Sequence, residues 1–171
     1  MTTDWQNWSG SQKHAALDLA FPESELAVAD LIQRAAGDGR NVRGIGSAHS
    51  FVPFWTDDYL VSLDNMAGLI SHDAAARQVT VWAGTKLHQL GEPLWDLGLA
   101  MENMGDIDRQ SVAGAISTGT HGTGATLQNI SSQVVGLRLV KANGAIVDID
   151  RSTDADLLRA DRINLVLSLQ A

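Results

Sequence analysis

The sequence predicts an α+β fold, with a small N-terminal unit followed by a larger unit whose mixed or antiparallel sheet is flanked by helices. The first part of the 171-residue chain shows strand and helix patterns in the order β-α-β-β. The second part contains two hairpin patterns, and each part holds one loop rich in glycine and hydroxyl residues, at residues 44–51 and 114–124. We therefore expect a first subdomain over residues 1–67 and a second over residues 68–171.

The N-terminal unit is predicted to be a small sheet with one crossover helix. Residues 14–20 have the pattern of a weak strand, and Pro22 ends it. A helix follows with acidic residues in its first turn, and Gly37 ends it. Its apolar residues recur at helical spacing at Leu26, Ala29, Leu31, Ile32 and Ala35. Residues 41–45 and 59–63 are then predicted to form two further strands.

The second unit is predicted to begin with a hairpin over residues 69–83 and a helix over residues 86–97. Thr85 is the expected cap of this helix, because a hydroxyl can accept a hydrogen bond from a free amide of the first turn. Pro93 predicts a kink or a break within the helix, since proline lacks the amide hydrogen.

The remaining elements follow the second glycine-rich segment. Residues 111–117 have the small side chains of a short, closely packed helix. Residues 134–149 are predicted to form a hairpin around Asn143-Gly144, because Asn-Gly favours the tight turn of paired strands. Residues 152–160 are a further helix candidate, and residues 165–169 are a candidate last strand.

The composition excludes several classes of function. A formal net charge of −8 argues against binding to nucleic acid or to an anionic membrane surface. The chain has no cysteine, which excludes disulfides, thiolate metal sites and a cysteine nucleophile. The N-terminal residues do not have the pattern of a signal peptide, and no apolar run approaches the roughly 20 residues of a membrane span. We expect a soluble, cytoplasmic protein.

The two loops suggest a phosphate-bearing ligand. Gly44-x-Gly46 allows close approach of backbone amides to an anion, although His49 replaces the last glycine of a G-x-G-x-x-G motif. Small residues and hydroxyls in the second loop suit a flat ligand, so the pair of loops favours a dinucleotide. Tight turns are the alternative for each loop alone. For His49 and His121 the alternative is a turn histidine bonded to backbone or a core histidine. No histidine spacing supports a metal site.

Four stretches carry a resemblance to a known family. They are residues 42–51, 79–85, 98–107 and 111–124. In these stretches the chain resembles the FAD-binding domain of the vanillyl-alcohol oxidase (PCMH-type) flavoprotein superfamily. It is most similar to the aldonolactone and alditol oxidase branch, which includes gulono-1,4-lactone, arabinono-1,4-lactone and sugar-alcohol oxidases.

The resemblance implies a PCMH-type fold with FAD extended between the two lobes. It implies that the first loop binds the pyrophosphate and that His49 bonds covalently to the methyl carbon on C8 of the flavin. The other residues of the first loop implied to bind FAD are Arg43, Gly44, Ile45, Gly46, Ser47, Ala48 and Ser50. The second implied set is Gly105, Asp106, Ser111, Ala113, Gly114, Ser117, Thr118, Gly119, His121 and Gly122. Ile146 and Val147 match a hairpin near the adenine half of the cofactor.

The chain also departs from the family pattern. The family oxidases continue into a substrate domain, whereas this chain stops at Ala171 and lacks a glycine-containing loop within residues 159–170. We therefore expect a shortened flavin-binding module, which is not catalytically competent alone. An oxidase completed by a partner chain and an interaction domain without cofactor are the alternatives. Apolar surface left without a substrate domain would favour a homodimer.

Overall fold

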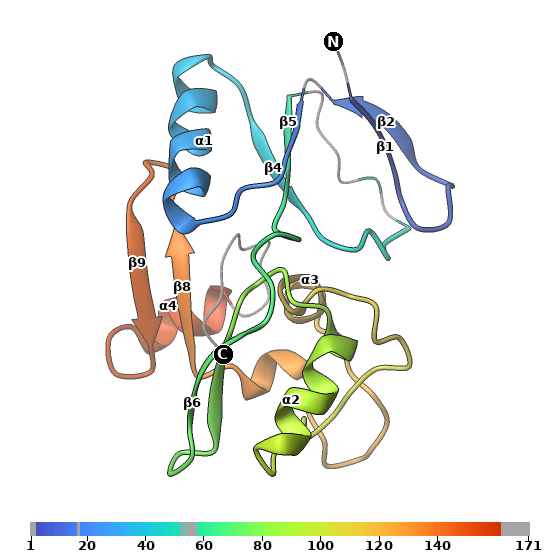
Figure 1. Cartoon of the computed structure of the whole chain (residues 1–171), viewed down its shortest axis with the longest axis vertical. Helices are drawn as coiled ribbons and strands as arrows, with labels where there is room; N and C mark the ends of the chain where they lie inside the picture. The colour runs from blue at the N-terminus through green and yellow to red at the C-terminus, as the bar shows by residue number, and fades with distance from the viewer. Residues whose placement is uncertain (1–2, 17, 52, 54–57, 162–171) are drawn as a thin grey trace.

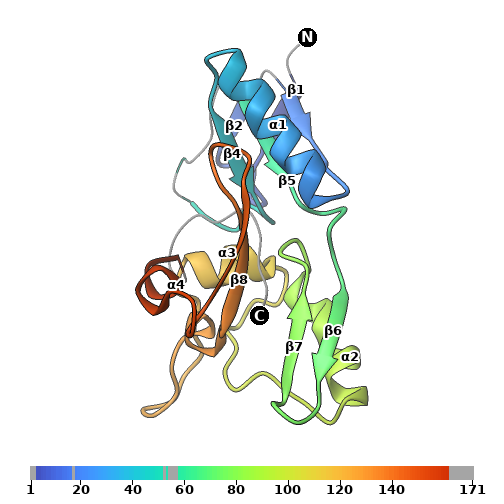
Figure 2. The ribbon, with the colours of Figure 1, turned by 90° about the vertical axis from the view of Figure 1, so that its left-hand side faces the viewer.

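The computed structural model describes residues 3–16, 18–51, 53 and 58–161 (Figure 1). The described elements form two lobes stacked along the long axis of the molecule (Figure 1). Strands β1 to β5 and helix α1 make up the N-terminal lobe. The elements from β6 onward make up the second lobe, from which the β8–β9 hairpin extends beside α1 (Figures 1 and 2). The candidate strand over residues 165–169 lies outside the described residues.

The N-terminal lobe contains the predicted crossover unit. Strands β3 (Asp18–Ala20), β5 (Tyr59–Ser62) and β4 (Val42–Ile45) form a parallel sheet in the order β3-β5-β4. Helix α1 (Glu25–Gly37) connects β3 to β4. It begins at Ser24, whose Oγ accepts a hydrogen bond from the amide of Ala27 at 3.2 Å. The β-α-β-β order inferred from the sequence is therefore present.

Four of the five residues in the predicted apolar repeat of α1 are buried, and Leu26 is the exception. Leu26 is 69% exposed, whereas Val28 is almost fully buried. The buried residues of α1 are Val28, Ala29, Leu31, Ile32 and Ala35. Val28, Leu31, Ile32 and Ala35 have the i, i+3, i+4, i+7 spacing of one helix face, which Leu26 does not share.

The predicted strand over residues 14–20 is wrong as a single element. It divides into β2 (Lys13–Ala16) and β3, which join different sheets. Strand β2 pairs antiparallel with β1 (Thr3–Gln6) and forms an N-terminal hairpin, while β3 pairs parallel with β5. Strand β1 was not predicted, because its Thr-Asp-Trp-Gln sequence has no apolar alternation.

The second lobe contains both predicted hairpins. Strands β6 (Leu69–Asp73) and β7 (Gln78–Val81) form one, and strands β8 (Gly136–Val140) and β9 (Ile146–Asp150) form the other. Gly144 has a φ of 79° in the β8–β9 turn, a conformation that glycine adopts without strain. Among the described strands, the two hairpins do not pair with each other, so the expected larger sheet is found here as two separate ladders.

The predicted helix over residues 86–97 is divided. It consists of the 3₁₀ helix η1 (Leu87–Leu90) and helix α2 (Gly91–Asp96), with Pro93 in the first turn of α2. Proline is tolerated there because amides of the first turn have no partner within the helix. Thr85 is not the cap: its buried Oγ1 donates to the carbonyl of Trp82 at 2.6 Å and accepts from the amide of Gly68 at 2.9 Å. It therefore closes a loop before the helix begins.

The remaining elements pack around one apolar core. They are helix α3 (Val112–Ser117), the 3₁₀ helix η2 (Ile130–Gln133) and helix α4 (Ala155–Asp161). A single buried cluster includes Leu31 of α1, Val61 of β5, Ile116 of α3 and Leu137 of β8. The core is therefore continuous between the lobes, and each large apolar side chain in it contributes roughly 1.5–3 kcal/mol by burial.

Candidate cofactor site

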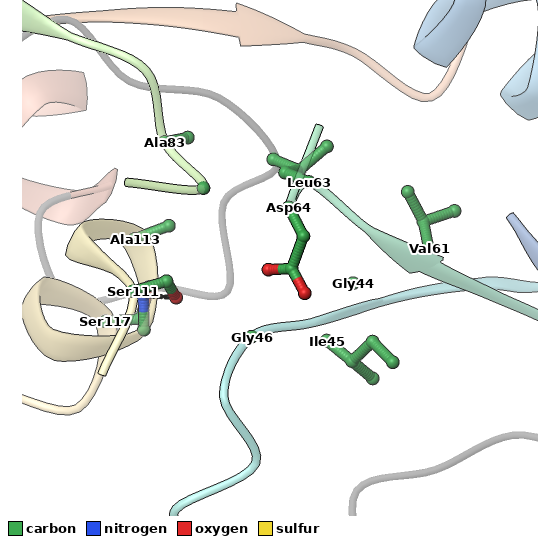
Figure 3. Close-up of a pocket in the computed structure, with 12 residues that line it drawn as sticks. Gly44, Ile45, Gly46, Val61, Leu63, Asp64, Ala83, Ser111, Ala113 and Ser117 are labelled. Atoms are coloured by element: carbon green, nitrogen blue, oxygen red, sulfur yellow. Dashed lines mark hydrogen bonds between the residues drawn. The ribbon is translucent and has the colours of Figure 1, made fainter. Parts of the chain in front are cut away.

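The first glycine-rich loop lies against the beginning of α3 and forms two adjoining pockets. The smaller, of about 60 Å³, also reaches β5 and the segment before Thr85 (Figure 3). The larger, of about 300 Å³, is lined by the loop after β4 and by the segment from Gln110 to Thr118. Both pockets share the lining residues Gly44, Gly46, Ser111, Gly114 and Ser117. The two loops therefore meet in space, and we refer to the two pockets together as the groove.

Small residues allow the two loops to approach closely. A Cβ atom on Gly46 would lie 2.5 Å from Oγ of Ser111, so no larger residue fits there without movement. The same Ser111 Oγ accepts a hydrogen bond from the amide of Gly114 at 3.2 Å, so Ser111 caps the N-terminus of α3. Ser47 Oγ donates to the carbonyl of Arg109 at 2.5 Å. These contacts hold the first loop in a defined position against α3.

Consecutive backbone amides of the first loop have no acceptor among the residues that the structure describes. Within the described part of the chain, the amides of Ser47, Ala48 and His49 donate no hydrogen bond. Ala48 has a φ of 52°, which costs a residue other than glycine about 1–2 kcal/mol. Successive amides around such a left-handed residue form a concave arrangement that suits an anion. This loop is therefore a better candidate phosphate site than the start of α3, whose Val112 and Ala113 amides donate to the carbonyls of Thr85 and Ala83.

The side chain of His49 lies where the first loop lines the larger pocket. Its imidazole stacks on the indole of Trp8, with ring centroids 5.4 Å apart and an angle of 20° between the planes. The sequence did not predict this contact, and the cofactor-binding role of His49 stays a prediction. Trp8 carried no signal in the sequence, because a tryptophan in a polar N-terminal segment fits no strand or loop motif.

The smaller pocket contains residues that the sequence did not identify. Figure 3 shows the carboxylate of Asp64 pointing into it, beyond the end of β5. Asp64 Oδ1 pairs with Nζ of Lys86 at 2.6 Å, so its charge is neutralised locally. Gly84 also lines this pocket, and a Cβ atom there would lie 1.8 Å from the carbonyl oxygen of Leu63. Only the resemblance over residues 79–85 pointed toward Gly84, and nothing pointed toward Asp64.

The second glycine-rich loop contributes only its first part to the groove. Ser111, Ala113, Gly114, Ser117 and Thr118 line it. His121 is exposed, and its Nδ1 lies 2.8 Å from the carbonyl oxygen of Gly122, as expected of a turn histidine. Gly119, His121 and Gly122 do not line either pocket.

Gly105 and Gly122, two glycines of the predicted set, lie where segments of the chain pack closely. A Cβ atom on Gly122 would lie 2.1 Å from the carbonyl oxygen of Met104, and one on Gly105 would lie 2.9 Å from Cγ2 of Thr120. Gly105 and Gly122 therefore allow the second loop to pack on the segment before α3. Asp106, next to Gly105, is exposed and does not line the groove.

Three other predicted residues also lie outside the groove lining. Arg43 is half-buried in β4, opposite Leu60 of β5, immediately before Gly44. Ile146 and Val147 begin β9, where Val147 packs against the core. The structure therefore gathers Gly44 to Ser50 with the first part of α3, and it does not bring the hairpin residues into the same pockets.

The groove fits FAD by its own geometry. The larger pocket offers consecutive amides that have no acceptor among the described residues and can bind a diphosphate. Glycines 44, 46 and 114 leave the backbone accessible to a flat group. In the described part of the chain, no three His, Asp or Glu side chains gather as a metal site would require. None of the helices in that part has the length and apolar character needed to cross a bilayer.

Comparison with known proteins agrees with this geometry. An L-gulono-1,4-lactone dehydrogenase from Mycobacterium tuberculosis is 40% identical over 155 residues, which cover 90% of this chain and 36% of the relative. A D-arabinono-1,4-lactone oxidase from Kluyveromyces lactis is 34% identical over 166 residues, which cover 94% of this chain and 32% of the relative. The chain thus spans about a third of the length of these curated relatives.

A solved structure shares the fold over nearly the whole chain. A cholesterol oxidase from B. sterolicum superposes with a TM-score of 0.82, over 99% of this chain and 36% of the other, at 20% sequence identity. At this sequence identity the similarity is evidence of the fold alone. The fold is the expected PCMH-type fold. The family described as FAD binding domain matches residues 17–150. This chain belongs to that family of FAD binding domains, and its cofactor is FAD.

Proposed function

We propose that the chain is the flavin-carrying part of a sugar-lactone or sugar-alcohol oxidase and that His49 holds the flavin covalently. The relatives that are at least 34% identical over nearly the whole chain are named as lactone dehydrogenases and oxidases, which supports this class of substrate. The observation that carries the proposal is the place of His49, which lines the larger pocket next to Ser47 and Ala48, whose amides have no acceptor in the described part of the chain.

Different residues of the groove bind different parts of FAD. The amides of Ser47 and Ala48 bind the diphosphate, and Gly46 and Gly114 allow backbone contact with the rest of the cofactor. The net charge of −8 gives no general attraction for an anion, so these local dipoles must supply the affinity. When bound, the flavin supplies a two-electron acceptor for a carbon–hydrogen bond next to a hydroxyl.

The covalent bond joins an imidazole nitrogen of His49 to the methyl carbon on C8 of the flavin. Formation of this bond would remove the N–H proton of His49 and a hydrogen of the methyl group, which is a loss of two electrons and two protons. Dioxygen would accept them as hydrogen peroxide, which balances the reaction. His49 is the nucleophile in this step, and its nitrogen must be unprotonated to attack.

Oxidation of a sugar requires groups beyond this groove. A hydride donor must be held over the acceptor and its hydroxyl proton must be removed by a base. Besides His49, the described groove offers one ionisable side chain, Asp64, and this carboxylate is paired with Lys86. We therefore propose that substrate oxidation depends on a substrate-binding part that covers the groove, and that this chain alone reduces its flavin slowly with any sugar lactone.

The test is to purify the chain, add FAD and measure flavin that stays attached after acid precipitation. We expect yellow protein with flavin on the denatured chain. Replacing His49 with Ala should remove the attached fraction and leave reversible FAD binding. The matched control is His72→Ala, since His72 is exposed on β6 and does not line the groove. Protein that takes up no FAD, or H49A protein with attached flavin, would overturn the proposal.

A further inference from the structure

The turn of the N-terminal hairpin contacts three consecutive residues around the candidate flavin attachment site. The amide of Trp8 donates a hydrogen bond to the carbonyl of Ala48 at 3.2 Å. The indole of Trp8 stacks on His49, and Nδ2 of Asn7 donates to the carbonyl of Ser50 at 3.1 Å. The turn therefore contacts His49 itself and the backbone on both sides of it.

Asn7 makes this turn rigid enough to support the loop. Its side chain is 2% exposed, and its Oδ1 accepts a hydrogen bond from the amide of Gln12 at 2.9 Å. Its Nδ2 also lies 3.1 Å from Oγ of Ser11, to which it donates. A buried amide group that is satisfied on both atoms is costly to displace, so the turn keeps its shape while it holds Ser50.

The exposure of Trp8 shows that core packing is not its main role. It is 56% exposed, whereas a tryptophan that stabilises a fold by burial loses most of its surface. Its ring contacts are with His49 and with Phe51, whose ring lies edge-on at 5.6 Å and 71°. Aromatic pairs of these two kinds favour one ring orientation over the others.

The stacking geometry suits a nucleophilic imidazole. The lone pair of an imidazole nitrogen lies in the plane of the ring, so an indole on one face leaves the nitrogen edge free to react. Rotation about the last side-chain bond of histidine is otherwise broad. We infer that Trp8 is a positioning residue that fixes the ring plane of His49 for attack on the flavin methyl carbon. This inference depends on the covalent role proposed above for His49.

The test follows the rate at which flavin becomes attached. The apoprotein is mixed with FAD, samples are denatured at intervals, and flavin fluorescence on the denatured chain is measured. Trp8→Phe keeps a stacking ring, while Trp8→Leu and Trp8→Ala do not. Trp95→Ala is the matched control, because Trp95 is 80% exposed on α2, outside the groove. Reversible FAD binding is compared between H49A and the double variant W8A/H49A, which isolates binding from attachment.

We expect attachment to slow by about tenfold or more in W8A and W8L, since small errors in orientation reduce rates strongly. W8F should stay within about threefold and W95A within about twofold of the unmodified chain, with FAD affinity in the H49A background unaffected by loss of Trp8. The NMR signals of the His49 ring protons should also lose their ring-current shift in W8A and keep it in W8F.

The outcomes separate this inference from the proposal on which it depends. An unmodified chain that attaches no flavin contradicts the covalent role of His49 and removes the inference with it. Attachment at an unchanged rate in both W8A and W8L contradicts the inference alone. A parallel loss of FAD affinity in W8A/H49A would mean that Trp8 supports the whole loop, which also overturns a role in orienting the ring. The use of W8L keeps the test decisive if W8A folds poorly.

Discussion

Arg138 of β8 forms an ion pair with Glu25 at the first position of α1, with Nη1 and Oε1 3.5 Å apart, and this pair joins the two lobes. The same guanidinium holds Asp148 of β9 in two parallel hydrogen bonds, from Nε at 2.7 Å and from Nη2 at 2.8 Å. Arginine suits this position because its planar donors can bind two carboxylates at once. One side chain thus connects the β8–β9 hairpin internally and to the other lobe.

Replacing Arg138 with Met should destabilise the chain by about 1 kcal/mol, because the pairs are only partly shielded from water. Chemical denaturation at neutral pH measures the loss. The matched control is Arg77→Met in the exposed β6–β7 turn. Equal stability of R138M and the unmodified chain would mean that the contact between the lobes is entirely apolar.

The same arrangement predicts a loss of stability in acid. The hydrogen bonds from Arg138 lower the pKa of Asp148, against an opposing contribution from burial. A carboxylate with a lowered pKa in the folded state stabilises the protein above its unfolded pKa of about 3.9 and loses this contribution as the pH falls through the folded value. The difference in unfolding free energy between the unmodified chain and Asp148→Asn should therefore shrink below about pH 4. A constant difference down to pH 2 would contradict this cause.

Replacing Gly84 with Ala should destabilise the fold by about 2–4 kcal/mol, because the new Cβ atom would overlap the carbonyl oxygen of Leu63. FAD binding should fall with it, since Gly84 lines the smaller pocket. Thermal melting with and without FAD gives both results. Gly37→Ala is the control: nothing lies within 4 Å of its Cβ position at the end of α1, so this variant should be as stable or slightly more stable.

The contact between Gly46 and Ser111 can be tested by a double-mutant cycle. Gly46→Ala should reduce FAD affinity by about tenfold, because its Cβ atom would displace Oγ of Ser111 from the groove lining. In the double variant G46A/S111A that overlap is gone, so part of the affinity should return. Titration of apoprotein with FAD measures both. Additive losses would show that the two residues act independently.

His121→Ala should leave FAD affinity and attachment within about twofold of the unmodified chain. The imidazole of His121 is exposed, and its hydrogen-bond contact among the described residues is with the neighbouring Gly122 carbonyl. This expectation reverses the role implied by the resemblance. Acid precipitation of the variant alongside H49A provides the comparison. A loss as large as that in H49A would restore His121 to the cofactor site.

Local patterns predicted the elements whose structure depends on neighbours in sequence. The apolar spacing of α1 and the Asn143-Gly144 turn are of this kind, and both are present. The division of residues 14–20 between two sheets was not predictable, because it depends on pairing with β1 and β5, which are distant or lack alternation. The prediction that Thr85 caps a helix was wrong for a related reason. A buried hydroxyl can form hydrogen bonds with backbone groups of a loop as well as with those of a helix end.

The candidate site could also be predicted only in part from the sequence. Glycines and hydroxyls at residues 44–51 and 111–118 predicted a groove, since close approach of backbone has a residue signature. The contact of Trp8 with His49 and the pair of Asp64 with Lys86 have no such signature, because each joins segments that only the folded chain brings together. Motif matching also assigned His121 to the cofactor from its neighbours, and this role stays untested: its Nδ1 lies 2.8 Å from the carbonyl oxygen of Gly122.

The continuous core has a consequence for how the cofactor enters. Leu31 of α1, Val61 of β5 and Leu137 of β8 belong to one buried cluster, so separating the lobes would expose apolar surface from both. A hinge opening is therefore an expensive route for a molecule as large as FAD. The cofactor should instead enter through the surface of the groove, with the buried cluster intact. The two lobes should then stay together while FAD binds, and they should unfold in one cooperative transition.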